Sequence, residues 1–218
     1  MISVKVCGIT RLQDALAAEK YGASAIGFIF HNNSPRLVSV NEVREWVSAI
    51  PKQLIKVGVF VDNDVDNINI ITDSLGLDMV QLHGSESPEY CKEISVPVVK
   101  VFRVGEGFNP KILDDYAVEA FLFDTFKKGN PGGTGECFNW HLISQLETDT
   151  PIILSGGLTA ENVGEGIKTI QPAAVDVNSG VESRPGIKDA LKIQCFMEMV
   201  SQIPIHNRYD WKFEGIKI

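Results

Sequence analysis

Eight short runs of apolar residues, rich in β-branched side chains, alternate with eight helical patterns along this chain of 218 residues. The runs are continuously apolar rather than alternating, which is typical of strands buried on both faces of a parallel sheet. They cover residues 3–7, 25–30, 55–61, 79–82, 98–103, 120–124, 152–154 and 174–177. The helical patterns cover residues 12–21, 40–49, 65–75, 88–94, 110–116, 140–146, 160–169 and 187–200. Such strand–helix units predict a (β/α)8 TIM barrel, a single catalytic domain over residues 1–203 with an extension over 204–218.

The polar and glycine-rich segments of the chain follow the predicted strands rather than precede them. Cys7-Gly8 follows the first strand, His83-Gly84 follows the fourth, and Asn178-Ser179-Gly180 follows the eighth. Segments that precede strands, such as Ser95-Val96-Pro97, carry no such polar, glycine-rich motif. A barrel builds its active site on the loops at the C-terminal ends of its strands, so this asymmetry supports the barrel. A doubly wound open sheet is the alternative, but no GxGxxG motif follows the first strand.

The composition bears on the kind of partner. With 20 basic and 28 acidic residues and no basic cluster, the chain is not expected to bind nucleic acid or a membrane surface. It shows no apolar stretch of about 18 residues and no leader, so we expect a cytoplasmic protein. The four cysteines and four histidines lack the spacing of disulfide frameworks or metal sites, so we expect no disulfide framework and no metal site. Monomer and homodimer both stay open.

Two side chains at strand ends are candidates for acid–base chemistry. Cys7 ends the first strand and Asp124 ends the sixth, so barrel closure places both at the same mouth. A thiol with positive charge nearby acts as a base, and a carboxyl group beneath a closing loop acts as an acid. The alternatives are a packing cysteine and an aspartate that caps a helix. The glycine-rich segment 125–138 after Asp124 is expected to be a functional loop, such as a lid.

The loops after the seventh and eighth strands predict a phosphate site. Gly156-Gly157 lies in the first loop and Asn178-Ser179-Gly180 in the second. TIM barrels often bind phosphate there, with backbone N–H groups and the N-terminus of a short extra helix. We expect that extra helix over residues 181–186.

Two further side chains are candidates for contacts with a substrate. Arg36 follows the second strand and is suited to binding a carboxylate bidentately, with Arg103 after the fifth strand as its rival. The alternative for Arg36 is a solvated surface position. His83 is either a substrate contact or a structural hydrogen-bonding residue.

The extension after Pro204 carries aromatic residues at alternate positions. Tyr209, Trp211 and Phe213 alternate with polar residues, as in an extended segment packed on the barrel. Its role is not readable from the sequence.

Together these motifs resemble the phosphoribosylanthranilate isomerases, (β/α)8 enzymes of tryptophan biosynthesis. The resemblance covers about residues 2–200 and rests on Lys5-Val6-Cys7-Gly8-Ile9-Thr10, Ser34-Pro35-Arg36, Gly58-Val59-Phe60, Val80-Gln81-Leu82-His83-Gly84, Asp124, Gly132-Gly133-Thr134-Gly135, Ser155-Gly156-Gly157-Leu158 with Asn162-Val163, and Asp176-Val177-Asn178-Ser179-Gly180-Val181-Glu182. Two positions depart from the family pattern, because Ser155 replaces the usual alanine and Asn178 the usual serine.

The resemblance implies an Amadori rearrangement of N-(5-phosphoribosyl)anthranilate to 1-(2-carboxyphenylamino)-1-deoxyribulose 5-phosphate. Asp124 would protonate the ribose ring oxygen, and Cys7 would remove the C2 proton. Arg36 would hold the anthranilate carboxylate. The further substrate-binding candidates are His83, Gly156, Gly157, Asn178, Ser179 and Gly180. No metal or redox cofactor would be needed, because the iminium nitrogen accepts the electrons.

Other interpretations involve related barrels. A ribosyl isomerase acting on histidine intermediates would be expected to carry aspartate in place of Cys7. Indole-glycerol-phosphate synthase would need a catalytic lysine on an early strand, for which Lys5 is a poor match. Another sugar-phosphate isomerase or epimerase is a further alternative. A non-catalytic sugar-phosphate sensor would require neither Cys7 nor Asp124.

Overall fold

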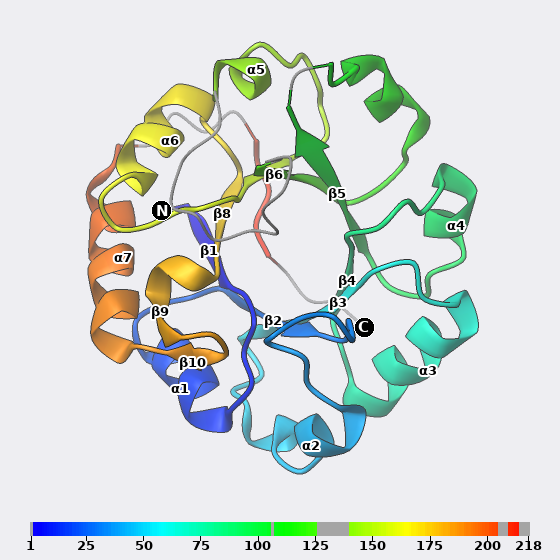
Figure 1. The fold of residues 1–218 in the computed structure, drawn as a ribbon. Helices are drawn as coiled ribbons and strands as arrows, with labels where there is room; N and C mark the ends of the chain where they lie inside the picture. The colour runs from blue at the N-terminus through cyan, green and yellow to red at the C-terminus, as the bar shows by residue number, and fades with distance from the viewer. Residues whose placement is uncertain (1, 106, 126–139, 205–208, 214–218) are drawn as a thin grey trace.

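Eight parallel strands close into a barrel (Figure 1). The structure is a computed structural model and describes residues 2–105, 107–125, 140–204 and 209–213. The strands are β1 (Ser3–Val6), β2 (Ala25–Ile29), β3 (Ile55–Phe60), β4 (Met79–Leu82), β5 (Val98–Val104), β6 (Ala120–Thr125), β7 (Ile152–Leu154) and β8 (Ala174–Val177). Each strand pairs with the next in sequence, and β1 pairs with β8 to complete the closure. The predicted TIM barrel is confirmed.

Helices cover the outside of the barrel, and local capping explains several of their ends. They are α1 (Leu12–Lys20), α2 (Val40–Arg44), η1 (Val47–Ala49), α3 (Val65–Leu75), α4 (Pro88–Lys92), η2 (Pro110–Asp115), α5 (His141–Ser144), α6 (Val163–Ile170) and α7 (Ala190–Gln202). Ser39 and Glu42 form a capping box at the start of α2. Asp64 caps α3, which ends at Gly76 in the left-handed conformation. Among the described helices, none has the length and apolar character needed to cross a membrane.

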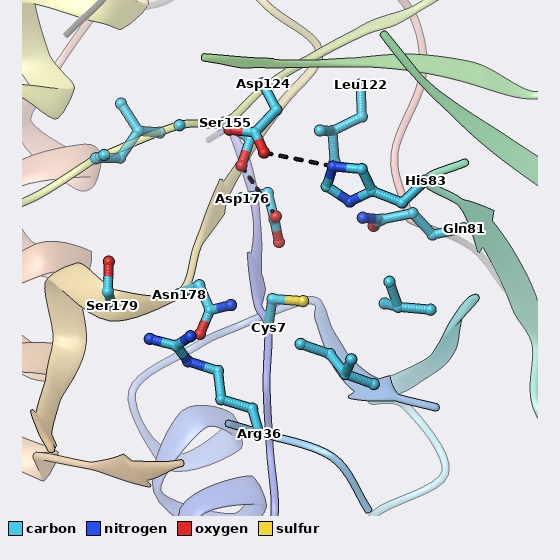
Figure 2. Close-up of a pocket in the computed structure, with 15 residues that line it drawn as sticks. Cys7, Arg36, Gln81, His83, Leu122, Asp124, Ser155, Asp176, Asn178 and Ser179 are labelled. Carbon is cyan, nitrogen blue, oxygen red and sulfur yellow. Dashed lines mark hydrogen bonds and ion pairs between the residues drawn. The ribbon is translucent and has the colours of Figure 1, made fainter. Parts of the chain in front are cut away.

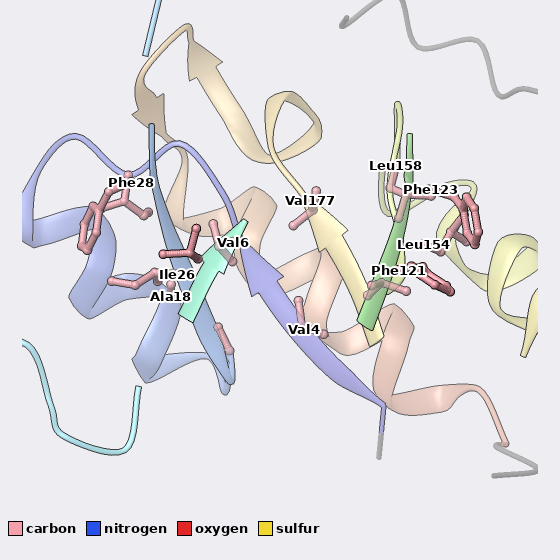
Figure 3. Packing of buried hydrophobic residues seen from close by; sticks show 14 of the residues in the cluster. Val4, Val6, Ala18, Ile26, Phe28, Phe121, Phe123, Leu154, Leu158 and Val177 are labelled. Atoms are coloured by element: carbon pink, nitrogen blue, oxygen red, sulfur yellow. The ribbon is translucent and has the colours of Figure 1, made fainter. Parts of the chain in front are cut away.

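Two apolar clusters hold the barrel together. The larger lies between the strands and the helices, where Val4 and Val6 of β1 join Ile26 of β2 and Ala18 of α1 (Figure 3). The smaller contains inward-facing side chains such as Val57, together with residues of six further strands. This division follows from the alternation of side chains along each strand.

Residues 209–213 pack at the end of the barrel opposite the site described below. Trp211 Nε1 donates a hydrogen bond of 2.7 Å to Glu119, which immediately precedes β6. Phe213 is 6% exposed and belongs to the interior apolar cluster with Ala25 and Ile55. Residues 209–213 are therefore packed against the N-terminal ends of the strands (Figure 1).

The prediction of an extra helix over 181–186 is wrong. A short 3-10 helix, η3 (Ser179–Val181), is followed by the hairpin strands β9 (Glu182–Arg184) and β10 (Ile187–Lys188). Gly186 has a φ of 78°, which turns the chain back, and its N–H donates to the Glu182 carboxylate. Asp189 then caps α7, so the last helix begins at Ala190 rather than at residue 187.

Candidate active site

A pocket lies where the C-terminal ends of the strands meet (Figure 2). Its lining includes eight of the nine predicted site residues, namely Cys7, Arg36, His83, Asp124, Gly156, Gly157, Asn178 and Ser179. Gly180 is not among the lining residues. Arg103, the rival to Arg36, lines two neighbouring pockets instead. The predicted lid segment lies outside the described residues from position 126 onward.

Cys7 follows the last residue of β1 and lies at the base of the pocket. Its backbone N–H donates to the Val177 carbonyl at 2.8 Å, which ties it to the end of β8. The residue is 4% exposed, so its thiol contacts the pocket without facing bulk solvent. Burial raises the pKa of this thiol, while the charge of Lys5 opposes the rise. A thiolate at this position therefore depends on the positive charge around it.

Asp124 and His83 come together on another wall of the pocket (Figure 2). His83 Nε2 lies 3.5 Å from Asp124 Oδ2, and both side chains are about a quarter exposed, at 22% and 26%. Asp124 is in register with Arg103 on β5, which places its carboxyl group at the rim of the barrel. Both side chains are open enough to meet a substrate.

Arg36 is held in place by a buried carboxylate. Its Nε and Nη2 donate to the two oxygens of Glu182 at 2.8 and 2.7 Å. Lys188 also donates to Glu182, at 2.9 Å. Despite burial, these cations hold the pKa of Glu182 below its ordinary value. Glu182 thus occupies one edge of the guanidinium, and among the described residues no hydrogen bond engages Nη1.

The two predicted phosphate loops meet at one side of the pocket. Gly156 and Gly157 have φ values of 89° and 66°, a region that glycine enters without strain. A Cβ at Gly180 would collide with the Leu158 carbonyl, so glycine there lets the loops after β7 and β8 pack together. Gly180 therefore shapes the loop pair from outside the pocket. The backbone of Gly156 and Gly157 lines the pocket directly.

The side chain of Asn178 is held by a hydrogen bond from Lys188. Lys188 Nζ donates to the side-chain oxygen of Asn178 at 2.9 Å and to its carbonyl at 3.1 Å. The same side-chain oxygen approaches Gly8, where an added Cβ would lie 2.7 Å away from it. Asn178 thus joins the loop after β8 to the loop after β1.

Sequence reasoning missed four polar residues at the base of the pocket. Gln81, Ser155 and Asp176 line it, and Lys5 lies beneath Cys7. All four are at least nine-tenths buried. The signal was present, because each is a polar residue in or just after an otherwise apolar strand. Among the described residues, the Gln81 side-chain oxygen has no hydrogen-bond partner.

Within 2–105, 107–125, 140–204 and 209–213, no group of three His, Cys, Asp or Glu side chains is placed to hold a metal ion.

The chain is similar to characterised proteins along almost its whole length. The family model described as N-(5'phosphoribosyl)anthranilate (PRA) isomerase matches residues 4–199. The N-(5'-phosphoribosyl)anthranilate isomerase of Stutzerimonas stutzeri (strain A1501) is 45% identical over 211 residues, covering 93% of this chain and 99% of that protein.

Solved structures agree with the sequence match. Phosphoribosyl anthranilate isomerase from Thermus thermophilus superposes with a TM-score of 0.84 at 33% identity, covering 93% of this chain and 100% of that one. A phosphoribosyl anthranilate isomerase in complex with reduced 1-(o-carboxyphenylamino)-1-deoxyribulose 5-phosphate gives a TM-score of 0.78 at 34% identity, covering 92% and 99%. The chain belongs to the N-(5'-phosphoribosyl)anthranilate isomerase family.

Proposed function

We propose that Cys7 and Asp124 are the base and the acid of an Amadori rearrangement. The chain is an isomerase that converts N-(5-phosphoribosyl)anthranilate to 1-(2-carboxyphenylamino)-1-deoxyribulose 5-phosphate in tryptophan biosynthesis. The observation that carries the assignment is that the Cys7 thiol, just after β1, and the Asp124 carboxyl group, at the end of β6, line the same pocket. General acid–base catalysis needs such a pair within reach of one substrate.

The first step opens the ribose ring. Asp124 donates a proton to the ring oxygen as the bond from that oxygen to C1 breaks. The lone pair of the anthranilate nitrogen then forms a double bond to C1, which gives an iminium ion. His83, 3.5 Å from Asp124, is placed to orient the carboxyl group during this transfer.

The second step moves a proton from carbon to sulfur. The Cys7 thiolate takes the proton on C2, and the C–H electrons form a double bond between C1 and C2. The iminium electrons return to nitrogen, so the product of this step is a neutral enolamine. Tautomerisation of the enolamine gives the ketone, so atoms and electrons balance without a redox partner.

Two anionic ends of the substrate fix its orientation. The ligand of one solved relative carries both a carboxyphenyl group and a phosphate. We assign the phosphate to the backbone of Gly156 and Gly157 and to Ser179, because the positive φ values of the glycines let an anion approach closely. The carboxylate is assigned to Arg36, whose Nη1 edge faces away from Glu182.

Several properties of the protein stay predictions. A cytoplasmic location and the lack of a nucleic-acid partner rest on the composition of the chain. The choice between monomer and homodimer stays open, and light scattering on the purified protein would decide it.

The catalytic assignment is tested by steady-state kinetics on freshly made phosphoribosylanthranilate, following the loss of anthranilate-type fluorescence. Cys7→Ala is expected to lower kcat by about 10²-fold or more, the usual scale for proton transfer. Asp124→Asn keeps the shape but lacks the transferable proton, so it is expected to lower kcat more than it raises KM. Cys91→Ala, which changes a buried cysteine on α4 outside the pocket, is the matched control.

Three outcomes would contradict the assignment. Near-normal turnover by folded Cys7→Ala would remove Cys7 as the base. A defect of Asp124→Asn confined to KM would make Asp124 a binding residue. Analogue binding without any turnover in the unaltered protein would favour a sugar-phosphate sensor.

A further inference from the structure

A lysine ammonium is buried inside the barrel next to Cys7. Lys5 lies on β1 and Cys7 follows the strand two positions later, so both side chains point to the barrel interior. A Cβ at Gly27 would lie 2.8 Å from the Cys7 sulfur and 3.2 Å from Lys5 Nζ. The sulfur and the ammonium therefore flank the same point, and glycine on β2 leaves room for both.

The ammonium is anchored from the neighbouring strand. Lys5 and Asp176 are in register on β1 and β8, and Lys5 Nζ donates to Asp176 Oδ1 at 2.7 Å. Ser155 Oγ donates to the other carboxylate oxygen at 3.2 Å. Lys5 and Asp176 are only 1% and 5% exposed, so solvent screens their charges little.

Packing alone does not account for a charged pair at this place. Burying two ions carries a large desolvation penalty, and an apolar pair of similar volume is often as stable. The inner cluster is otherwise built from apolar side chains such as Val57 and Leu122. A cation retained inside it points to a group that requires positive charge.

Cys7 is such a group. The charged groups that act on it are Lys5 on its own strand, Asp176 on β8 and Lys188 on β10, while Arg36, His83 and Asp124 lie on the remaining walls of the pocket. Burial raises the pKa of the Cys7 thiol, Lys5 opposes this most strongly, and Asp176 adds to it. Burial also disfavours the charge on Lys5, but Asp176 and Cys7 outweigh it and raise the pKa of Lys5, which keeps its charge.

We propose that Lys5 is a positioning residue for the reaction: its ammonium, held by the Asp176 carboxylate, is the counter-charge that lets Cys7 exist as a thiolate at the base of the pocket. The role rests on the proposed function of Cys7 as the base. Lys5 transfers no proton in it. When the C2 proton reaches the sulfur the thiolate becomes a neutral thiol, and Lys5 and Asp176 keep their charges.

The test measures the ionisation of Cys7 without using turnover. Alkylation of Cys7 by iodoacetamide is followed by mass spectrometry of its peptide as a function of pH, because only the thiolate reacts. Lys5→Met is expected to raise the alkylation midpoint by about one pH unit or more, the usual effect of losing a nearby opposite charge. Asp176→Asn is expected to lower the midpoint, because it removes a negative charge from the same place.

Controls separate this electrostatic role from a structural one. If Lys5→Met does not fold, the double variant K5M/D176N removes both charges together, and its midpoint is expected to lie between those of the single variants. Lys100→Met and Glu86→Gln alter a second buried pair of the same chemistry and are expected to leave the midpoint unchanged.

Midpoints that move in the same direction in Lys5→Met and Asp176→Asn, or that do not move, would overturn the proposal. The midpoints are independent of whether Cys7 is the base, which the kinetics of Cys7→Ala decide. The two claims therefore fail separately.

Discussion

The barrel holds two buried lysine–carboxylate pairs that look alike but have different surroundings. Lys5 pairs with Asp176 at 2.7 Å and Lys100 with Glu86 at 2.8 Å, and all four side chains are at most 5% exposed. Lys100 also donates to the Gly84 carbonyl, and Glu86 accepts the N–H groups of Asp62 and Gly84. The second pair therefore ties the loops after β3 and β4 to β5.

Among the described residues, the side-chain hydrogen bonds of the first pair reach only other side chains. Asp176 lines the pocket, its second oxygen accepts the Ser155 hydroxyl, and Lys5 acts on Cys7. The comparison shows that a buried ion pair has no fixed role. Where its spare hydrogen bonds reach backbone it stabilises loops, and where its charge reaches a reactive thiol it adjusts that thiol.

The largest expected effect is at the loop-tying pair. Glu86→Ala leaves Lys100 buried without its carboxylate and two backbone N–H groups without their acceptor. We expect the free energy of unfolding to fall by about 3–5 kcal/mol, as for other broken buried pairs. Urea unfolding measures this loss, with Glu93→Ala, a change at an exposed glutamate on the same segment, as the control. A loss of stability no larger than that of the control would contradict the claim that the Lys100–Glu86 pair stabilises the loops.

A substitution at the far end of the barrel tests whether lower stability of the fold by itself changes the ionisation of Cys7. Phe213→Ala empties a site in the interior cluster, so we expect a loss of about 3 kcal/mol in the free energy of unfolding. The Cys7 alkylation midpoint is expected to stay where it is. Leu191→Ala, at a 70% exposed position, is the control for stability. A midpoint that follows stability in Phe213→Ala would mean that the shift in Lys5→Met is not electrostatic.

The two lysines are expected to differ in their effect on the pH profile. Fewer Cys7 thiolates exist at a given pH when the thiol pKa rises, so Lys5→Met should move the acidic limb of kcat/KM to higher pH. Near pH 7 we expect about a tenfold lower kcat/KM, matching a rise of about one pKa unit, with recovery as the pH increases. Lys100→Met should lower stability without moving that limb. If Lys5→Met and Lys100→Met displaced the pH profile of kcat/KM equally, the two pairs would not differ in their effect on Cys7.

The smallest expected effect is at Ser155, one of the two positions where the chain departs from the family pattern. Ser155→Ala removes one hydrogen bond to Asp176, and we expect a loss of about 1 kcal/mol in the free energy of unfolding. Alkylation across pH should show a midpoint change far smaller than that of Lys5→Met. A change of equal size would assign control of Cys7 to the Ser155 hydroxyl rather than to the lysine charge.

The repeating part of the fold was readable from the sequence, and the exceptions have local causes. Continuous apolar runs located all eight strands, because a closed parallel barrel buries both faces of each strand. Residues 181–186 were misjudged as a helix because the turn at Gly186 and the cap at Asp189 act through single contacts that periodicity does not show.

The sequence predicts the site residues that follow strands, but it does not predict those that lie within strands. Cys7 and Asp124 lie at strand ends and are predicted as site residues. Asp176 lies within β8, so no loop position marks it as a site residue. The ion pair of Lys5 with Asp176 on the neighbouring strand joins residues 171 positions apart, so periodicity and spacing do not predict it. The contact of Arg36 with Glu182 spans 146 positions and has no sequence signature.

The central claim is that Cys7 takes the proton from C2. A crystal structure of this protein with the reduced product, 1-(o-carboxyphenylamino)-1-deoxyribulose 5-phosphate, tests it most directly. We predict C2 at about 3–3.5 Å from the Cys7 sulfur, the reach of a reacting pair, with the phosphate against Gly156 and Gly157. A complex in which C2 faces another basic side chain, with Cys7 beyond contact, would contradict the account.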